Sequence, residues 1–281
     1  MLDAGALAVE VSDPNEGALG EVPVYAEPGE PGATLWPISR IAALFDESED
    51  VDTACSRAAA TIARSLPVWE ARAVADEDWV RATQKQFGPI RVADSLWIVP
   101  SWCVPPDPGA RNLILDPGLA FGTGSHPTTR LCLEWLHENL AGGETLLDYG
   151  CGSGILAIAA AKLGAREVSG TDIDPQALMA SKANAIANGV VASFAAPDAL
   201  AAATHDVVIA NILTNPLLLL APALAARVRG GGRVALTGIL ATQAGAVIGA
   251  YERWFRIAPW RAADGWTLLA GMRLDDIRGA P

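Results

Sequence analysis

A glycine-rich loop between a short apolar strand and an apolar helix limits the fold of this chain more than any other feature. Thr145–Tyr149 is typical of a buried β-strand, and residues 155–163 are typical of a helix. Between them lie Gly150, Gly152 and Gly154, which we expect to bind a cofactor. Because glycine has no Cβ, such a loop lets backbone N–H groups and a helix N-terminus approach a ligand closely. The pattern predicts a Rossmann-like α/β sheet with a ligand at one edge.

A carboxylate follows the next expected strand. The strand expected at 167–171 is followed directly by Asp172, twenty-two positions after Gly150. A helix is expected at 175–188, with Asp174 as its N-cap. A carboxylate at the place of Asp172 is suited to accept two hydrogen bonds from ribose hydroxyls, so a nucleoside-type cofactor is expected. The alternative is a tight structural turn, with Asp172 solvated or capping the following helix.

The spacing of the glycines distinguishes between cofactors. A dinucleotide-binding loop places its third glycine at position 155, where this chain has Ile155. Here the third glycine comes one residue earlier, and Asp148 precedes the loop by two. This arrangement favours S-adenosylmethionine, which has no pyrophosphate to bind, and disfavours an NAD(P) dehydrogenase.

Asn211 is the candidate catalytic residue. It follows an expected strand at 206–210, and in a doubly wound sheet the first and fourth strands flank the point where ligands bind. Its amide could orient a methyl-accepting amine, or it could satisfy backbone groups in the turn before Pro216. Adenine methylation in nucleic acid is disfavoured, because Ile212 and Leu213 follow Asn211 where such enzymes have Asn-Pro-Pro-aromatic.

The segment 116–129 is unusually rich in glycine and hydroxyl residues and precedes a helix that we expect to begin near Pro127. Thr128 and Thr129 fall in its first turn, where they could contact the ligand. His126 is a candidate general base, although a histidine at a helix start more often caps the helix or packs. His137 and His205 are expected to be surface or structural residues.

The charge balance argues against several classes of function. The 281 residues contain 20 Lys and Arg against 32 Asp and Glu, which leaves a net charge of −12. Direct binding to nucleic acid needs a basic surface, whereas a basic protein partner is compatible with this charge. No apolar run approaches the roughly 20 residues of a membrane span. The four scattered cysteines form no metal-binding pair, so a cytoplasmic protein without metal or membrane contact is expected.

The positions of the proline- and glycine-rich stretches predict two domains. Residues 1–104 have loop-rich stretches, a helical pattern at 52–66 and short strands at 68–73 and 96–99. The run Pro-Pro-Asp-Pro-Gly at 105–109 is the expected linker, which leaves residues 105–281 for the ligand-binding domain. Within that domain a glycine turn is expected before a strand at 233–237, and the domain should end in an antiparallel hairpin of residues 256–260 and 266–272.

Several motifs together resemble one family, the PrmA-type methyltransferases of the large-subunit ribosomal protein L-eleven (L11). They are Asp-Pro-Gly at 116–118, Phe-Gly-Thr-Gly-x-His-Pro-Thr-Thr at 121–129, the glycine loop with residues 155–158, Asp-Ile-Asp-Pro at 172–175, Asn-Ile-Leu at 211–213 and Leu-x-Gly-Ile-Leu at 236–240. A weaker resemblance extends over Trp36, Asp78-Trp79 and residues 97–102.

The resemblance implies a class I methyltransferase sheet, mostly parallel with a closing antiparallel hairpin, and S-adenosylmethionine as methyl donor. It also implies a small N-terminal α+β domain that captures L11, whose lysine side chains or α-amine would be methylated. Carried over position by position, the cofactor contacts are Thr129, Gly150, Asp172 and Asn211. Compared with the family, the first domain is expected to be truncated at its start. The chain is expected to be a monomer, and the alternative function is a non-catalytic homologue that binds the cofactor and docks on a partner.

Overall fold

The computed structural model describes residues 1–15, 38–73, 87–116 and 126–274 and divides into two compact units, Met1–Trp79 and Val80–Pro281. This division precedes the linker expected at 105–109. In the second unit β3 (Ile90–Ala93) pairs with β4 (Leu96–Val99), and β4 pairs in parallel with β5 (Arg111–Ile114). These pairings span the proline-rich run, so the strand expected at 96–99 belongs to the second unit. The Phe-Gly-Thr-Gly segment at 121–124 lies outside the described residues.

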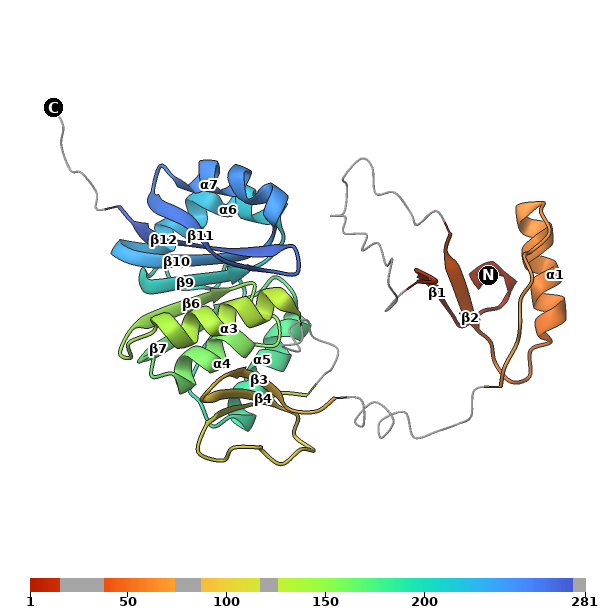
Figure 1. Ribbon diagram of the computed structural model, residues 1–281, viewed down its shortest axis with the longest axis horizontal. Helices are drawn as coiled ribbons and strands as arrows, with labels where there is room; N and C mark the ends of the chain where they lie inside the picture. The colour runs from red at the N-terminus through yellow and green to blue at the C-terminus, as the bar shows by residue number, and fades with distance from the viewer. Residues whose placement is uncertain (16–37, 74–86, 117–125, 275–281) are drawn as a thin grey trace. The chain divides into compact units, whose positions relative to one another are not determined.

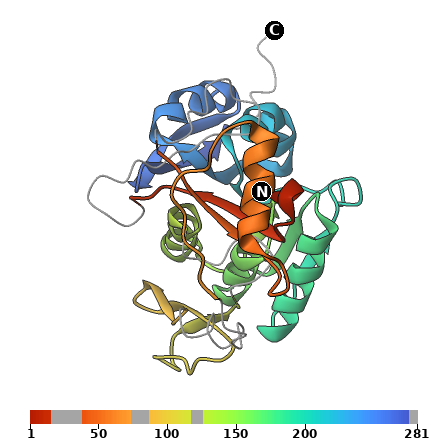
Figure 2. The same ribbon diagram turned by 90° about the vertical axis from the view of Figure 1, so that its right-hand side faces the viewer.

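The first unit contains a 3-10 turn, a two-stranded sheet and a helix (Figures 1 and 2). Strand β1 (Ala8–Ser12) pairs antiparallel with β2 (Arg40–Leu44). The helix α1 (Val51–Ile62) begins at Asp50, whose side chain accepts a hydrogen bond from the Asp52 N–H. The helix is held to the 3-10 turn η1 (Leu2–Ala4) by a hydrogen bond of 2.9 Å from the Arg57 guanidinium to the Ala4 carbonyl.

The strand expected at 68–73 is wrong, because these residues belong to no strand or helix. Val68 is fully exposed and Trp69 is partly so. A strand is stable only when its backbone groups pair with a neighbour, and an apolar pair of side chains does not supply that neighbour.

The second unit is built on a seven-stranded sheet in the order β11-β12-β10-β9-β6-β7-β8. Its strands are β6 (Thr145–Tyr149), β7 (Glu167–Thr171), β8 (Ser193–Ala195), β9 (His205–Asn211), β10 (Val228–Leu240), β11 (Phe255–Ala263) and β12 (Trp266–Arg273). The five strands from β10 to β8 in this order are parallel, whereas β12 and β11 form the antiparallel hairpin. The fold class predicted from the sequence is therefore confirmed.

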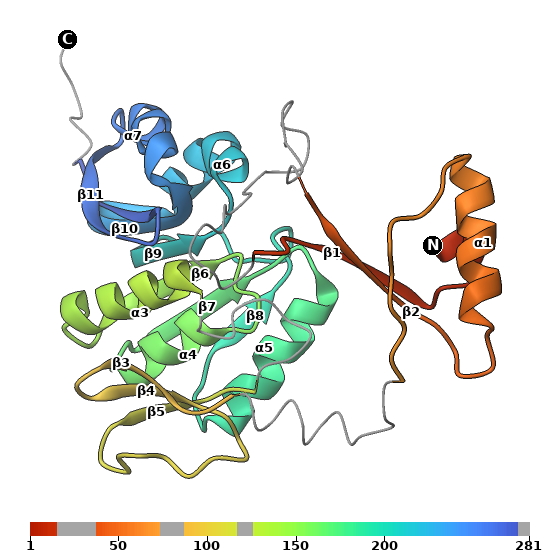
Figure 3. The same cartoon turned by 45° about the vertical axis from the view of Figure 1, so that its right-hand side comes forward.

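Helices cover both faces of this sheet (Figure 3). One face packs against α3 (Pro127–Asn139), α4 (Ile155–Lys162) and α5 (Pro175–Ala187), and the other packs against α6 (Thr214–Arg227) and α7 (Ala244–Tyr251). The 3-10 turn η2 (Ala241–Gln243) leads into α7. Leu146 and Ile209 lie in the first core and Leu147 and Val208 in the second, as the alternation of side chains along a strand requires. No helix in the described ranges is long and apolar enough to cross a bilayer.

Strand β10 begins earlier than the sequence pattern predicts. We expected a glycine turn before a strand at 233–237, but the strand already starts at Val228. Its register with β9 shifts between Val228 and Arg233, where three glycines lie. A bulge thus replaces the turn, because residues without side chains can be accommodated as extra positions in a strand.

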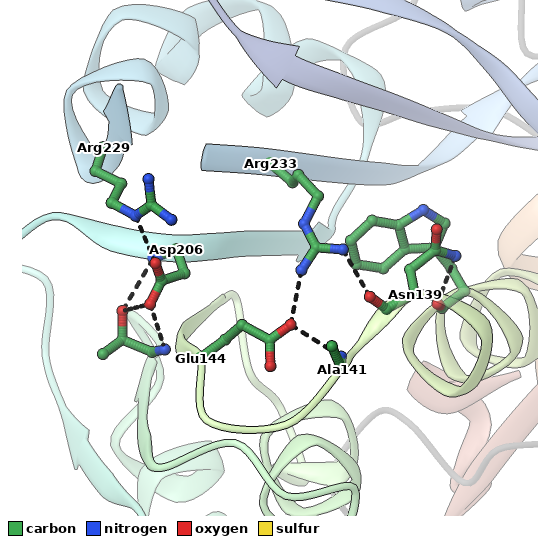
Figure 4. A network of polar contacts seen from close by, with 8 residues as sticks. Asn139, Ala141, Glu144, Asp206, Arg229 and Arg233 are labelled. Carbon is green, nitrogen blue, oxygen red and sulfur yellow. Dashed lines mark hydrogen bonds and ion pairs between the residues drawn. The ribbon is translucent and has the colours of Figure 1, made fainter. Parts of the chain in front are cut away.

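Hydrogen bonds and ion pairs connect the amino ends of β6, β9 and β10 (Figure 4). Arg233 on β10 donates to Glu144 at 2.9 Å and to the carbonyl of Asn139 at 2.6 Å. Asp206 on β9 accepts two hydrogen bonds from Thr145 at the start of β6, at 2.8 and 2.9 Å. These contacts stabilise the edge of the sheet opposite to the carboxyl ends of β6, β7 and β9.

Candidate functional site

The carboxyl ends of three neighbouring strands bring the expected site residues to one edge of the sheet. Tyr149 of β6 is in register with Thr171 of β7 and with Ala210 of β9. Gly150, Asp172 and Asn211 each come one residue later in the chain. Residues that are far apart in sequence therefore lie together at the carboxyl ends of β6, β7 and β9. The point beside β6 and β9 where the strand order reverses is the usual ligand position in sheets of this kind.

The loop after β6 takes a conformation that demands glycine. Gly150, Gly152 and Gly154 have φ angles of 79°, 50° and 80°. A Cβ on Gly150 would overlap Cγ2 of Ile212, and one on Gly154 would lie 2.9 Å from Cβ of Ser181. The glycines thus allow both the backbone conformation and the close approach of neighbouring elements.

Asp172 binds this loop directly. Its Oδ2 accepts a hydrogen bond of 2.9 Å from the N–H of Gly152, and its Oδ1 accepts one of 3.0 Å from the N–H of Asp174. The cap of α5 is Asp174, which accepts a hydrogen bond from Gln176. The structure therefore does not support the alternative in which Asp172 caps that helix.

Asn211 and Thr129 contact each other across 82 positions of sequence. Nδ2 of Asn211 donates to Oγ1 of Thr129 at 3.3 Å, and Thr129 is buried in the first turn of α3. This contact joins β9 to the N-terminus of α3. Asn211 thus has a side-chain partner on α3 rather than only backbone groups of its own turn.

His126 caps α3. Its Nδ1 lies 2.7 Å from Oγ1 of Thr128 and accepts from the Thr128 N–H, and its ring meets that of Trp266 edge to face at 5.2 Å. Burial lowers the pKa of His126, which favours the neutral ring that a capping acceptor needs. One ring nitrogen is thus engaged in the cap. His205 is buried at the start of β9, and burial lowers its pKa as well.

Two residues near the loop are not among the predicted site residues. Asp148 is completely buried; its Oδ2 accepts from the N–H of Ala157 at 3.1 Å, whereas Oδ1 has no hydrogen-bond partner in the described part of the chain. Burial, together with the negative charge of Asp172, raises the pKa of Asp148 to about 7. Ile173, directly after Asp172, is an apolar side chain with 87% of its surface exposed. The sequence signal for Asp148 is a charge inside an apolar strand.

These residues fit a nucleoside cofactor with a cationic amino acid portion. The buried oxygen of Asp148 that has no hydrogen-bond partner within the described ranges suits a positively charged group, and the exposed apolar side chain next to Asp172 suits a purine ring. No group of three or more His, Cys, Asp or Glu residues in the described ranges could hold a metal ion.

The strand order, the glycine loop after β6 and the acid after β7 define a class I methyltransferase domain. The chain belongs to the ribosomal protein L11 methyltransferase (PrmA) family, whose profile matches residues 1–273. Enzymes of this family depend on S-adenosylmethionine.

Ribosomal protein L11 methyltransferases from several organisms are similar to this chain over almost its whole length. The ribosomal protein L11 methyltransferase of Thiobacillus denitrificans is 55% identical over 274 residues, covering 97% of this chain and 93% of the relative. That of Chromobacterium violaceum is 54% identical over 273 residues, covering 97% and 92%. The crystal structure of the ribosomal protein L11 methylase from Lactobacillus delbrueckii subsp. bulgaricus is 36% identical with a TM-score of 0.60, covering 67% of this chain and all of that one.

Proposed function

We propose that this chain transfers methyl groups from S-adenosylmethionine to amino groups of ribosomal protein L11, on lysine side chains, the α-amine or both. The observation that carries the proposal is the hydrogen bond from the Gly152 N–H to Asp172, which joins the loop after β6 to the acid after β7. Membership of the family supplies the reaction and the substrate.

Asp172 has hydrogen-bonding capacity left for a ribose. A carboxylate offers about four acceptor positions, and the N–H groups of Gly152 and Asp174 occupy one on each oxygen. The remaining positions suit the two ribose hydroxyls. The exposed side chain of Ile173 offers apolar surface to the adenine next to them.

Asp148 and the glycine loop are suited to the amino acid portion of the donor. Oδ1 of Asp148 would accept hydrogen bonds from its ammonium group, and the backbone of Gly150 and Gly152, which carries no side chain, permits close approach. Thr129, at the N-terminus of α3, would contact the same portion. When bound, S-adenosylmethionine supplies a methyl group on a positively charged sulfur.

Asn211 would orient the accepting amine. Its Nδ2 is engaged by Thr129, so its Oδ1 remains as an acceptor for an amine N–H. The attacking nitrogen must be neutral and in line with the methyl group, and near-attack positioning contributes up to about 7–11 kcal/mol to such reactions. Asn211 accepts a hydrogen bond without removing a proton, which leaves the proton to solvent.

Deprotonation of the amine is the step that its surroundings must assist. For a lysine of pKa about 10.4 the neutral form costs roughly 4.6 kcal/mol at pH 7, whereas an α-amine costs about 1 kcal/mol. Apolar surroundings lower the pKa of an amine by desolvation, and Leu213, which is partly exposed, lies two residues after Asn211.

The first unit is proposed to recognise L11. Its small sheet exposes apolar side chains, among them Val11 and Ile41, which are paired across β1 and β2. The net charge of −12 favours a basic protein as partner. We infer a cytoplasmic location from the proposed action on a ribosomal protein.

A transfer assay tests the function. Purified chain is incubated with L11 and S-adenosylmethionine that carries a tritiated methyl group, with other large-subunit proteins as controls. We expect label in L11, and loss of that label in an Asp172→Ala variant that remains folded. Donor binding by calorimetry without any transfer would instead support the non-catalytic alternative.

A further inference from the structure

One face of α5 buries polar side chains at helical spacing. Ser181, Asn184 and Asn188 follow at intervals of three and four residues, which places them on the same side of the helix. Ser181 and Asn188 are buried, and Asn184 is half-buried. Because a buried polar group without a partner is costly, each of these side chains must bind something specific.

Asn188 binds the free edge of β5. Its Oδ1 accepts from the Ile114 N–H at 2.8 Å, and its Nδ2 donates to the Ile114 carbonyl at 2.7 Å. A neighbouring strand would make the same pair of bonds, so the side-chain amide substitutes for a strand at this edge. Nδ2 also donates to the carbonyl of Asn184 at 2.9 Å.

Asn184 binds the glycine loop. Its Nδ2 donates to the carbonyl of Ser153 at 2.8 Å. One turn earlier the hydroxyl of Ser181 donates to the carbonyl of Leu178 at 3.0 Å, and Ser181 lies so close to Gly154 that a Cβ there would come within 2.9 Å of Cβ of Ser181. Helix α5 therefore contacts the loop at two residues, Ser153 and Gly154.

The two ends of this loop segment are held from different sides. On one side the Gly152 N–H donates to Asp172, and on the other the Ser153 carbonyl accepts from Asn184. These bonds act on adjacent residues, so together they fix how the backbone between them is turned. Removal of the Asn184 side chain takes away this hydrogen bond to the Ser153 carbonyl.

We propose that Asn184 is a positioning residue for the methyl donor, acting through the backbone of the glycine loop, whereas Asn188 binds the edge of β5 and the backbone of α5. The proposal rests on the donor site proposed above. Asn184 acts on a loop that would contact the donor, and Asn188 acts on a strand of another sheet. Asn184 on α5 and Asn188 at the C-cap of α5 therefore form a matched pair of the same residue type that bind different parts of the protein.

Asn184→Ala and Asn188→Ala are compared by calorimetric titration with S-adenosylmethionine and by urea unfolding. The loss of one hydrogen bond of ordinary strength changes an equilibrium constant by about five- to tenfold. We therefore expect the donor Kd of Asn184→Ala to rise about five- to tenfold, and that of Asn188→Ala to stay within about twofold. Both variants should unfold at lower urea concentration, because each loses buried hydrogen bonds.

Steady-state kinetics and a second variant complete the test. In Asn184→Ala we expect the KM for the donor to rise while kcat at saturating donor stays within about twofold. Asn184→Asp keeps the size of the side chain but replaces the donating NH2 with an acceptor facing a carbonyl, so it should weaken donor binding at least as much. An equal change of Kd in both alanine variants, or no change in Asn184→Ala, would overturn the proposal. Failure of the wild-type chain to bind the donor would instead overturn the proposed function.

Discussion

Replacement of Asp148 by asparagine tests how strongly the stability of the fold depends on the protonation of this buried carboxyl group. Asp148 has 0% of its surface exposed, and burial with the charge of Asp172 raises its pKa from 3.8 to about 7. In the unfolded chain the pKa returns to its ordinary value. Between these two values the native state therefore holds a proton that the unfolded state has released.

The sign and size follow from proton linkage. Because the native pKa is the higher one, the contribution of Asp148 to stability is fully present below about pH 4 and is lost as the pH rises to about 7. About three pH units at about 1.36 kcal/mol each give roughly 4 kcal/mol in total. An asparagine side chain cannot ionise, so Asp148→Asn should gain stability relative to wild type by about 1.4 kcal/mol per pH unit in this window.

Urea unfolding of both proteins from about pH 4.5 to about pH 8.5 measures the difference, and groups that titrate in both cancel. The amide oxygen of the variant can still accept from Ala157, but its NH2 takes the place of the unpartnered Oδ1. That unsatisfied donor adds a constant cost of about 1–3 kcal/mol, so the slope and not the offset carries the test. A difference that does not change with pH would refute the reasoning.

Three further substitutions test other parts of the second unit. Gly150→Ala should destabilise the fold by about 1–3 kcal/mol through overlap with Ile212, whereas Gly143→Ala, with a similar φ of 83° and open space, measures the backbone strain alone; urea midpoints separate the two. Asn211→Ala should lower kcat about a hundredfold at saturating donor through misplacement of the amine, and normal transfer with weak donor binding would contradict the orienting role. Asp206→Asn should cost about 1–3 kcal/mol near neutral pH. The hydrogen bond from the backbone N–H of Thr145 lowers the pKa of Asp206 to about 2. In urea titrations the difference in stability between variant and wild type should therefore shrink as the pH falls below 3.8.

Local chemistry made much of the second unit predictable from its sequence. Thr145–Tyr149 and Glu167–Thr171 form strands as expected, and α5 begins after the cap Asp174 and ends one residue before the predicted end. These elements carry their own signals in apolar runs, caps and glycines. The segment at 68–73 failed because a strand needs a partner, and pairing is not a local property.

The contacts between distant residues were beyond the sequence patterns. Asn211 could be placed at the sheet edge by topology, but its partner Thr129 depends on how α3 crosses β9. The bonds from Asn188 to Ile114 join positions 74 residues apart. Neither Thr129 nor Asn188 has a pattern of its own, since both are polar residues at helix ends, where capping is the usual explanation.

A single physical rule nevertheless connects the residues that were missed. Asp148 lies in a strand whose preceding residues are apolar, and Asn184 lies on the side of α5 that faces the protein interior. Burial of either side chain is unfavourable unless it meets a partner, so a polar residue at a position where the pattern requires an apolar one indicates a specific contact. Here Asn184 binds the backbone of the glycine loop, and one buried oxygen of Asp148 has no hydrogen-bond partner among the residues that the structure describes. Polar residues out of place in the hydrophobic pattern therefore lead to the proposed donor site as directly as the glycines do.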